Sequence, residues 1–262
     1  MSCLARQAKV LVAEAEEDNL EHKELTVRWR RWDTCSLCEQ EYHGVVRCAL
    51  GWACWKTYLG RSEMNGARCM AMNVLGLGLS EAEHNTDALS VRESELSIMR
   101  RRGTSEEQML AMQTNLALAY GKLRRMEDSL RIRQDVYSGR LKLNGEEHGK
   151  TLTAANNYAI SLVRGQRIEE AKSLLRKTIP VAQRILRDGD ATMLQMRWNY
   201  ARALCMDTGT TLDDLREAVT TLEETERIAQ HVLGAVHPTT VGIERDLQIS
   251  RAMLRARETP PA

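Results

Sequence analysis

The sequence has 262 residues, a formal net charge of +1, 43% hydrophobic residues and 28% charged residues. A chain of this length can bury a substantial core, and its near-neutral charge predicts no general attraction to nucleic acid, membranes or acidic substrates. Only four prolines and no phenylalanine occur, which favours helices. The longest uncharged run, residues 69–80, is too short to span a bilayer, so we expect no membrane segment.

The N-terminal segment lacks the pattern of a secretory signal. Acidic residues enter at positions 14–18, before an apolar stretch of signal-peptide length has formed. We therefore expect a cytoplasmic protein. In a reducing compartment its seven cysteines are expected to be thiols or metal ligands rather than disulfides.

Four soft metal ligands then follow in the segment CSLCEQEYHGVVRC, residues 35–48. They have the spacing C-x2-C-x4-H-x4-C of a CCHC zinc knuckle and are Cys35, Cys38, His43 and Cys48. Three thiolates and one imidazole can complete a tetrahedral Zn2+ site. The preceding segment VRWRRW, residues 27–32, interleaves arginine with tryptophan, which suits stacking on single-stranded nucleic acid. Together these features form one hypothesis, an alternative in which the chain is a zinc-assisted nucleic-acid-binding protein.

A second interpretation needs no metal. Known knuckles carry glycine where this sequence has Glu39 and Tyr42. The stretch that follows is apolar and compatible with a helix, on which free Cys48 would behave as a small hydrophobic residue. Residues 1–65 would then be an irregular helical cap over the apolar end of the rest of the chain, with no cofactor required and nucleic acid not expected as a partner.

A repeat of 42 residues organises the remainder. Residues 114–130 (TNLALAYGKLRRMEDSL) align without a gap with residues 156–172 (NNYAISLVRGQRIEEAK), and a further step of 42 leads to 198–206 (WNYARALCM). A step of 41 backwards leads to 73–89. Each unit is typical of two amphipathic helices, with small residues where the helices touch and an acidic pair in the first turn of the second helix. One such pair cannot bury its apolar face alone, so the units must stack.

The predicted fold is therefore all-α, a right-handed superhelical solenoid of about four helix pairs with a helical N-terminal cap. The expected organisation is a cap at 1–65, repeats at 66–256 that end in a capping helix at 239–256, and a tail at 257–262. His148 and His237 stand in the linkers between helix pairs and are predicted to cap the helices that follow.

The repeats resemble tetratricopeptide repeats, and among them the kinesin light chain type with its 42-residue period. The resemblance is carried by NLALAY and NNYAISL in the first helices, by RMEDSL and RIEEAK in the second, and by the linkers 144–151 and 233–240. It implies a concave groove that takes a peptide or protein partner. Arg124 stands where the family usually has a turn glycine, which leaves the detailed turn geometry open.

The expected groove residues lie along the first helices, three and four positions apart. They offer amides for a peptide backbone, cations for acidic groups and one aromatic anchor, and are Asn115, Lys122, Asn156, Asn157, Arg164, Trp198, Asn199 and Arg202. The asparagines could equally bridge neighbouring helices. No catalytic motif is present, since the chain has no Ser-His-Asp order, phosphate-binding glycine loop or HExxH. The sequence thus predicts a non-enzymatic interaction scaffold.

Overall fold

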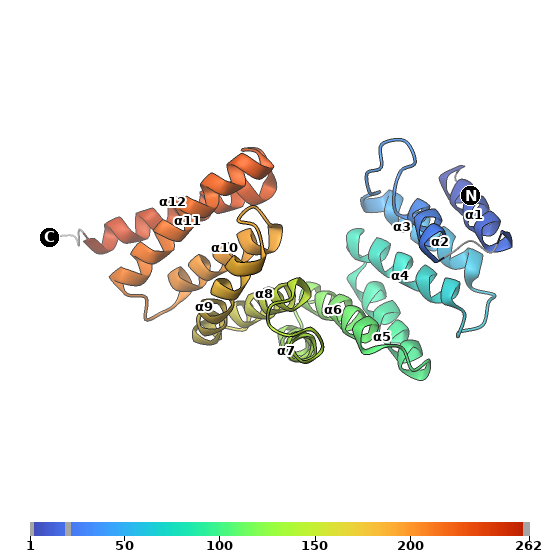
Figure 1. Ribbon diagram of the computed structural model, residues 1–262, viewed down its shortest axis with the longest axis horizontal. Coiled ribbons are helices and arrows are strands. Elements are labelled where there is room, and N and C mark those ends of the chain that lie inside the picture. Colours follow the sequence, from blue (N-terminus) through green and yellow to red (C-terminus); the bar gives the residue numbers. More distant parts are fainter. Residues whose placement is uncertain (1–2, 19–21, 259–262) are drawn as a thin grey trace. The chain divides into compact units, whose positions relative to one another are not determined.

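The computed structural model describes residues 3–18 and 22–258, with the side chains of residues 22 and 23 excepted. Within these residues all regular elements are helical (Figure 1), apart from one isolated bridge between Thr34 and Glu41. The all-α prediction is confirmed. The chain divides into two compact units, residues 1–125 and 126–262, and each is described by itself. No helix among the described residues is long and apolar enough to cross a membrane.

In the described part of unit 1 there are six α-helices. They are α1 (Cys3–Glu17), α2 (His22–Trp29), α3 (Gly44–Tyr58), α4 (Gly66–Glu81), α5 (Asn85–Arg101) and α6 (Glu106–Lys122), with a short 3-10 turn, η1 (Arg30–Trp32), after α2. Helix α4 packs against α3 on one side and α5 on the other, and α5 packs against α6. The core of its N-terminal part contains Trp29 and Trp32, whose rings lie 5.0 and 6.3 Å from the ring of Tyr58.

Unit 2 contains the remaining six. They are α7 (Met126–Asn144), α8 (Gly149–Arg164), α9 (Ile168–Ile185), α10 (Ala191–Met206), α11 (Leu212–Leu233) and α12 (Pro238–Glu258). Each helix packs against the next, and α8 also contacts α10, the first helix of the following pair. The fully buried side chains of Leu152, Leu175, Met193 and Leu222 join these helices in one apolar cluster. The stacking of helix pairs is therefore present within this unit.

Small residues occupy the contacts between helices, as the period predicts. Small residues recur at one position in the first helix of each pair and at one in the second, and all are at most 3% exposed. They are Ala117, Ala159 and Ala201 in the first helices and Ala88, Ser129, Ala171 and Ala218 in the second helices. Any longer side chain at these places would separate the backbones, because helix pairs at close distance leave room for little beyond a methyl group.

The turns within the helix pairs repeat as well. Glu83, Arg124 and Gln166 have φ values of 63°, 59° and 60°, so the left-handed residue recurs at steps of 41 and 42. A residue in this conformation ends many α-helices, and it is usually glycine because a Cβ there is unfavourable. The register read from the sequence is thus confirmed at the turn, although none of these three residues is glycine.

Helix starts are fixed by side-chain caps. Asn65 and Asp190 accept hydrogen bonds from the first backbone N–H groups of α4 and α10, and Thr211 forms a reciprocal capping box with Asp214. His148 Nδ1 accepts from the backbone N–H of Lys150 at 3.1 Å, and His237 Nδ1 accepts from that of Thr239 at 3.2 Å. The two linker histidines therefore cap helices, as predicted.

Candidate functional site

Two of the predicted groove asparagines form a bridge between helices. Asn156 on α8 is 1% exposed and Asn199 on α10 is 8% exposed. Asn199 Nδ2 donates to Asn156 Oδ1 at 3.0 Å, and Asn156 Nδ2 donates to Gln195 Oε1 at 3.3 Å. Buried amides need such partners. These two amides therefore join consecutive helix pairs, which is the structural alternative that the sequence left open.

Asn157 is placed differently from its neighbour. The 42-residue alignment puts Asn157 in the same column as Asn199, but Asn156 is the residue that reaches Asn199. Asn157 is half-buried, and its backbone carbonyl accepts a hydrogen bond from Arg133 Nη1 at 3.2 Å. Burial and, to a smaller extent, the nearby charge of Arg164 together lower the pKa of Arg133 to about 10. Asn157 therefore lies beside the guanidinium group of Arg133, which is itself near that of Arg164.

A hollow of about 280 Å³ lies between α8 and α10. Its lining residues are Ile160, Val163, Arg164, Gln195, Trp198, Asn199 and Arg202. Four of the eight predicted groove residues are thus brought together in unit 2. Arg164 and Arg202 are exposed and give the hollow a cationic rim over an apolar wall of Ile160 and Val163. Such a surface can receive carboxylate groups beside an apolar side chain.

Trp198 is anchored rather than free. Its indole Nε1 donates to Asp246 Oδ2 on α12 at 2.8 Å, and a Cβ added at Gly242 would come within 2.6 Å of its ring. Arg202 lies 3.4 Å from the same carboxylate and 5.9 Å from the ring centroid. Trp198 therefore forms a fixed wall of the hollow, held against the last helix, and it positions Arg202 at the rim.

The two remaining predicted groove residues belong to unit 1. Asn115 is half-buried on α6, and Lys122 is exposed at the end of that helix. Lys122 Nζ donates to the backbone carbonyl of Ser80, at the end of α4. This contact ties the ends of two helices in unit 1.

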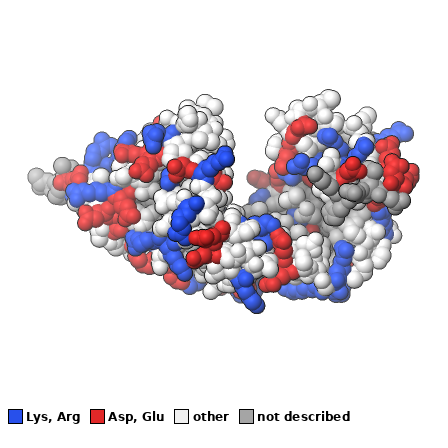
Figure 2. Space-filling model, viewed as in Figure 1, with Lys and Arg blue, Asp and Glu red and all other residues white. Residues whose placement is uncertain are grey.

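Charges of both signs are interspersed on the face of the molecule shown in Figure 2, with basic side chains next to acidic ones.

The four candidate zinc ligands do not converge. Cys35 and Cys38 lie in the turn before α3, and the backbone N–H groups of Cys38 and Leu37 lower the pKa of the Cys35 thiol. His43 precedes α3 and lies 3.8 Å from Glu81. Cys48 is buried against Leu75 and Leu79 of α4. Among the described residues no three His, Cys, Asp or Glu side chains come close enough to hold a metal ion.

The arginine–tryptophan segment is also engaged in packing. Trp29 is 4% exposed and Trp32 is fully buried, so neither ring presents a broad solvent-exposed face on which a base could stack. Arg47, which follows the cysteine turn, lies between the carboxylates of Glu41 and Glu81 at 3.0 Å each. Trp29, Trp32 and Arg47 are thus engaged in contacts within unit 1.

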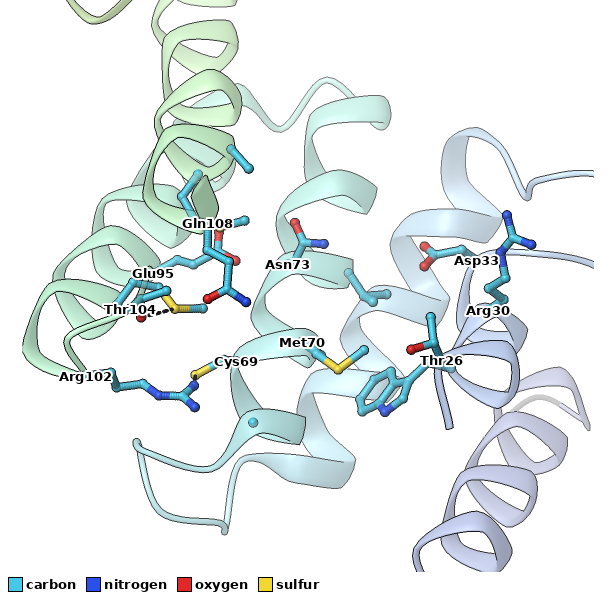
Figure 3. A pocket seen from close by; sticks show the side chains of 16 residues that line it. Thr26, Arg30, Asp33, Cys69, Met70, Asn73, Glu95, Arg102, Thr104 and Gln108 are labelled. Atoms are coloured by element: carbon cyan, nitrogen blue, oxygen red, sulfur yellow. Dashed lines mark hydrogen bonds between the residues drawn. The ribbon is translucent and has the colours of Figure 1, made fainter. Parts of the chain in front are cut away.

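The sequence did not reveal a second hollow, which lies in unit 1 (Figure 3). It is lined from α2, α4, α5 and α6, and its polar residues include Asn73, Glu95 and Arg102. One signal could have indicated it. Arg92 and Glu95 fall on the same face of α5 as Ala88 and Leu96, where only apolar residues are expected, and all four are buried.

Comparison with protein families identifies a repeat family. The tetratricopeptide repeat model matches residues 108–184, which covers the predicted repeats around Asn115 and Asn157. No curated protein sequence matches the chain. The family resemblance of this segment, read from its period, is therefore confirmed.

Solved structures share the fold over most of the chain. A Podosopora anserina putative kinesin light chain with nearly identical TPR-like repeats has a TM-score of 0.58 at 18% identity, over 89% of this chain and 99% of that one. BtubC (BKLC) from P. vanneervenii has a TM-score of 0.50 at 14% identity, over 100% and 96%. A Rap protein complexed with Competence and Sporulation Factor has a TM-score of 0.51 at 12% identity, over 80% and 59%. The fold is that of kinesin light chain-like helical repeats.

Proposed function

We propose that this tetratricopeptide repeat protein of kinesin light chain-like fold is a non-enzymatic scaffold that binds an extended acidic peptide segment of a protein partner. The hollow between α8 and α10 carries the proposal, because two exposed arginines, Arg164 and Arg202, line it together with the side of Trp198. A related fold has been found in complex, since the similar Rap protein was crystallised with Competence and Sporulation Factor.

Binding would depend on the two arginine side chains more than on the asparagines of the predicted groove. Asn199 already donates to Asn156, and Asn156 donates to Gln195, so a peptide backbone that recruited these amides would have to break a buried hydrogen bond. The guanidinium groups of Arg164 and Arg202 are exposed. That of Arg202 also faces Asp246 at 3.4 Å, and both groups can donate hydrogen bonds to carboxylates of a ligand. An apolar residue of the peptide would lie against Ile160 and Val163. The bound segment would thus combine acidic residues with one apolar side chain.

The experiment compares peptide binding by the full chain and by two charge variants. A fluorescent peptide array of acidic ten-residue segments selects the probe, and fluorescence anisotropy measures its affinity. Arg164→Gln with Arg202→Gln should weaken binding by about 10-fold to 100-fold, since hydrogen bonds to charged groups contribute about 1.5–3 kcal/mol. Arg187→Gln with Arg227→Gln changes the same net charge at exposed positions of unit 2 outside the hollow and should leave the affinity within about twofold.

Two results would reject the proposal. One is equal loss of affinity in both double variants, which would indicate a general effect of net charge. The other is a selected peptide whose affinity is the same for the unmodified chain and the Arg164/Arg202 variant.

A further inference from the structure

The cavity in unit 1 has the size of a specific ligand site. Its volume is about 510 Å³, within the range of roughly 300–1,000 Å³ found for ligand pockets. Helix α4 forms its floor with residues 66, 69, 70, 73 and 74, which are spaced three and four apart and so share one helix face. Residues of α2 and η1 line one side and residues of α5 and α6 the other (Figure 3).

A buried carboxylate with one unpartnered oxygen lines this cavity. Glu95 is 2% exposed. Its Oε2 pairs with Arg92 at 2.7 Å, whereas Oε1 is buried and has no hydrogen-bond partner among the described residues. Arg92 is itself committed, because it also donates to the side chain and the backbone carbonyl of Asn73. Leaving a buried acceptor without a donor costs about 1–3 kcal/mol, and more for a charged group. The unpartnered oxygen of Glu95 therefore favours a ligand that brings a hydrogen-bond donor.

The donor that fits best is a primary ammonium group. Burial raises the pKa of the Glu95 carboxyl, with Arg92 opposing the change, so a cation beside the carboxyl would favour its ionised form. A guanidinium group binds a carboxylate through two parallel hydrogen bonds, but only one oxygen of Glu95 lacks a partner. An ammonium acts as a single charge with three rotatable donors on a flexible stem. The geometry thus selects lysine over arginine.

The apolar part of the remaining lining matches an aliphatic stem. Met70, Met99 and Met112 supply thioether side chains from three different helices, and Trp29 adds an aromatic surface. Methionine adapts to the shape of an inserted chain. Arg30 and Arg102 also line the cavity, and they can pair with acidic groups that flank the inserted residue. We propose that this cavity binds a lysine side chain of a partner peptide, with its ammonium on Glu95 Oε1 and its stem among the three methionines.

This proposal specifies a second recognition point for the scaffold role and rests on that role, but it uses residues of unit 1 alone. The test follows the methyl signals of 13C-methyl methionine in the full chain by NMR. The probes are Nα-acetyl-lysine N-methylamide, its norleucine and arginine analogues, and n-butylamine. The lysine probe should shift the signals of Met70, Met99 and Met112 in a saturable way and bind at least about 10-fold more tightly than the norleucine probe.

Two variants keep the test decisive. Glu95→Gln should bring the lysine and norleucine probes to equal affinity, whereas Asp87→Asn, the same charge change at an exposed site on α5, should preserve the preference. Should Glu95→Gln fail to fold, Ala111→Leu fills the cavity from α6 without changing a charge and should abolish binding of every probe. Ala49→Leu, on the exposed side of α3, is its control.

The outcomes separate clearly. Absence of saturable shifts with the lysine probe, or equal affinity for lysine and norleucine in the unmodified chain, would overturn the site. Arginine binding as tightly as lysine would overturn the single-oxygen argument, and n-butylamine binding as tightly would assign the pocket to free amines instead of a peptide. Arg164→Gln with Arg202→Gln should leave these titrations unchanged, so the unit 2 proposal stands or falls separately.

Discussion

The amide bridge between Asn156 and Asn199 should contribute to stability more than any other polar contact of the predicted groove. In Asn199→Ala, Asn156 Oδ1 loses its donor at a position that is 1% exposed, where water cannot readily replace it. The cost of an unsatisfied buried acceptor is about 1–3 kcal/mol. Asn157→Ala removes a neighbouring, half-buried amide and should cost less than about 1 kcal/mol.

Urea unfolding followed by circular dichroism measures both variants. Asn156→Leu combined with Asn199→Leu replaces both partners with apolar side chains of similar size and should be less destabilising than Asn199→Ala, because no buried polar atom is then left alone. A double-mutant cycle over the two positions should give a coupling energy of about 1 kcal/mol or more. Additive effects, or an Asn199→Ala variant as stable as Asn157→Ala, would refute the assignment of these asparagines to a structural bridge.

Four further predictions concern packing, turns, caps and charge. Gly78→Ala should destabilise the chain by about 1–3 kcal/mol in thermal unfolding, because its Cβ would lie 2.7 Å from the backbone oxygen of Arg47; Gly66→Ala, with open space around it, should be nearly neutral. Gln166→Gly should stabilise by up to about 1 kcal/mol in urea unfolding, since it relieves a left-handed residue at φ 60°; no gain would indicate that unfolded-state entropy cancels the relief. Thr211→Ala should cost about 1 kcal/mol of unfolding free energy by removing the capping box of α11, and an unchanged midpoint would contradict this. Hydrogen bonding to Lys172 lowers the pKa of Asp207 to about 2, so its contribution is present above the unfolded pKa near 3.9 and is lost as pH falls toward 2; Asp207→Asn should flatten the decline of stability over that interval.

The sequence predicted the repeat because the repeat is a packing requirement. Residues such as Ala159 and Ala201 must be small for helices to touch, so they recur with the period and are found fully buried. The left-handed turn residues follow the same register. Such constraints act over short distances along the chain, and a single sequence displays them directly.

The sequence could not decide which polar side chains are consumed by packing. Asn156 and Asn157 are adjacent and chemically identical, yet a rotation of about 100° per residue around α8 buries one and leaves the other half-exposed. Trp198 is of a residue type that often anchors a partner. Here its indole donates to Asp246 and packs against Gly242, both from α12, which begins some forty residues later. The cysteine spacing likewise does not reveal that Cys48 packs against Leu75 and Leu79 of α4. Each outcome depends on contacts distant in sequence.

The two hollows differ in whether their buried polar atoms already have hydrogen-bond partners, and this difference predicts how salt affects binding at each. Around the unit 2 hollow the buried amides of Asn199 and Asn156 already donate hydrogen bonds to Asn156 and Gln195, so a ligand gains little from them. Its affinity must come from the exposed arginines, whose attraction for carboxylates is screened by salt. Around the unit 1 cavity Glu95 retains an unsatisfied oxygen away from water, where an added donor gains a stronger interaction and salt screens it less. Raising the ionic strength should therefore weaken peptide binding that depends on Arg164 and Arg202 more steeply than lysine binding that depends on Glu95. If both affinities fall equally with ionic strength, the Glu95 site is as accessible to solvent as Arg164 and Arg202. Lysine binding at the buried oxygen of Glu95 would then be refuted.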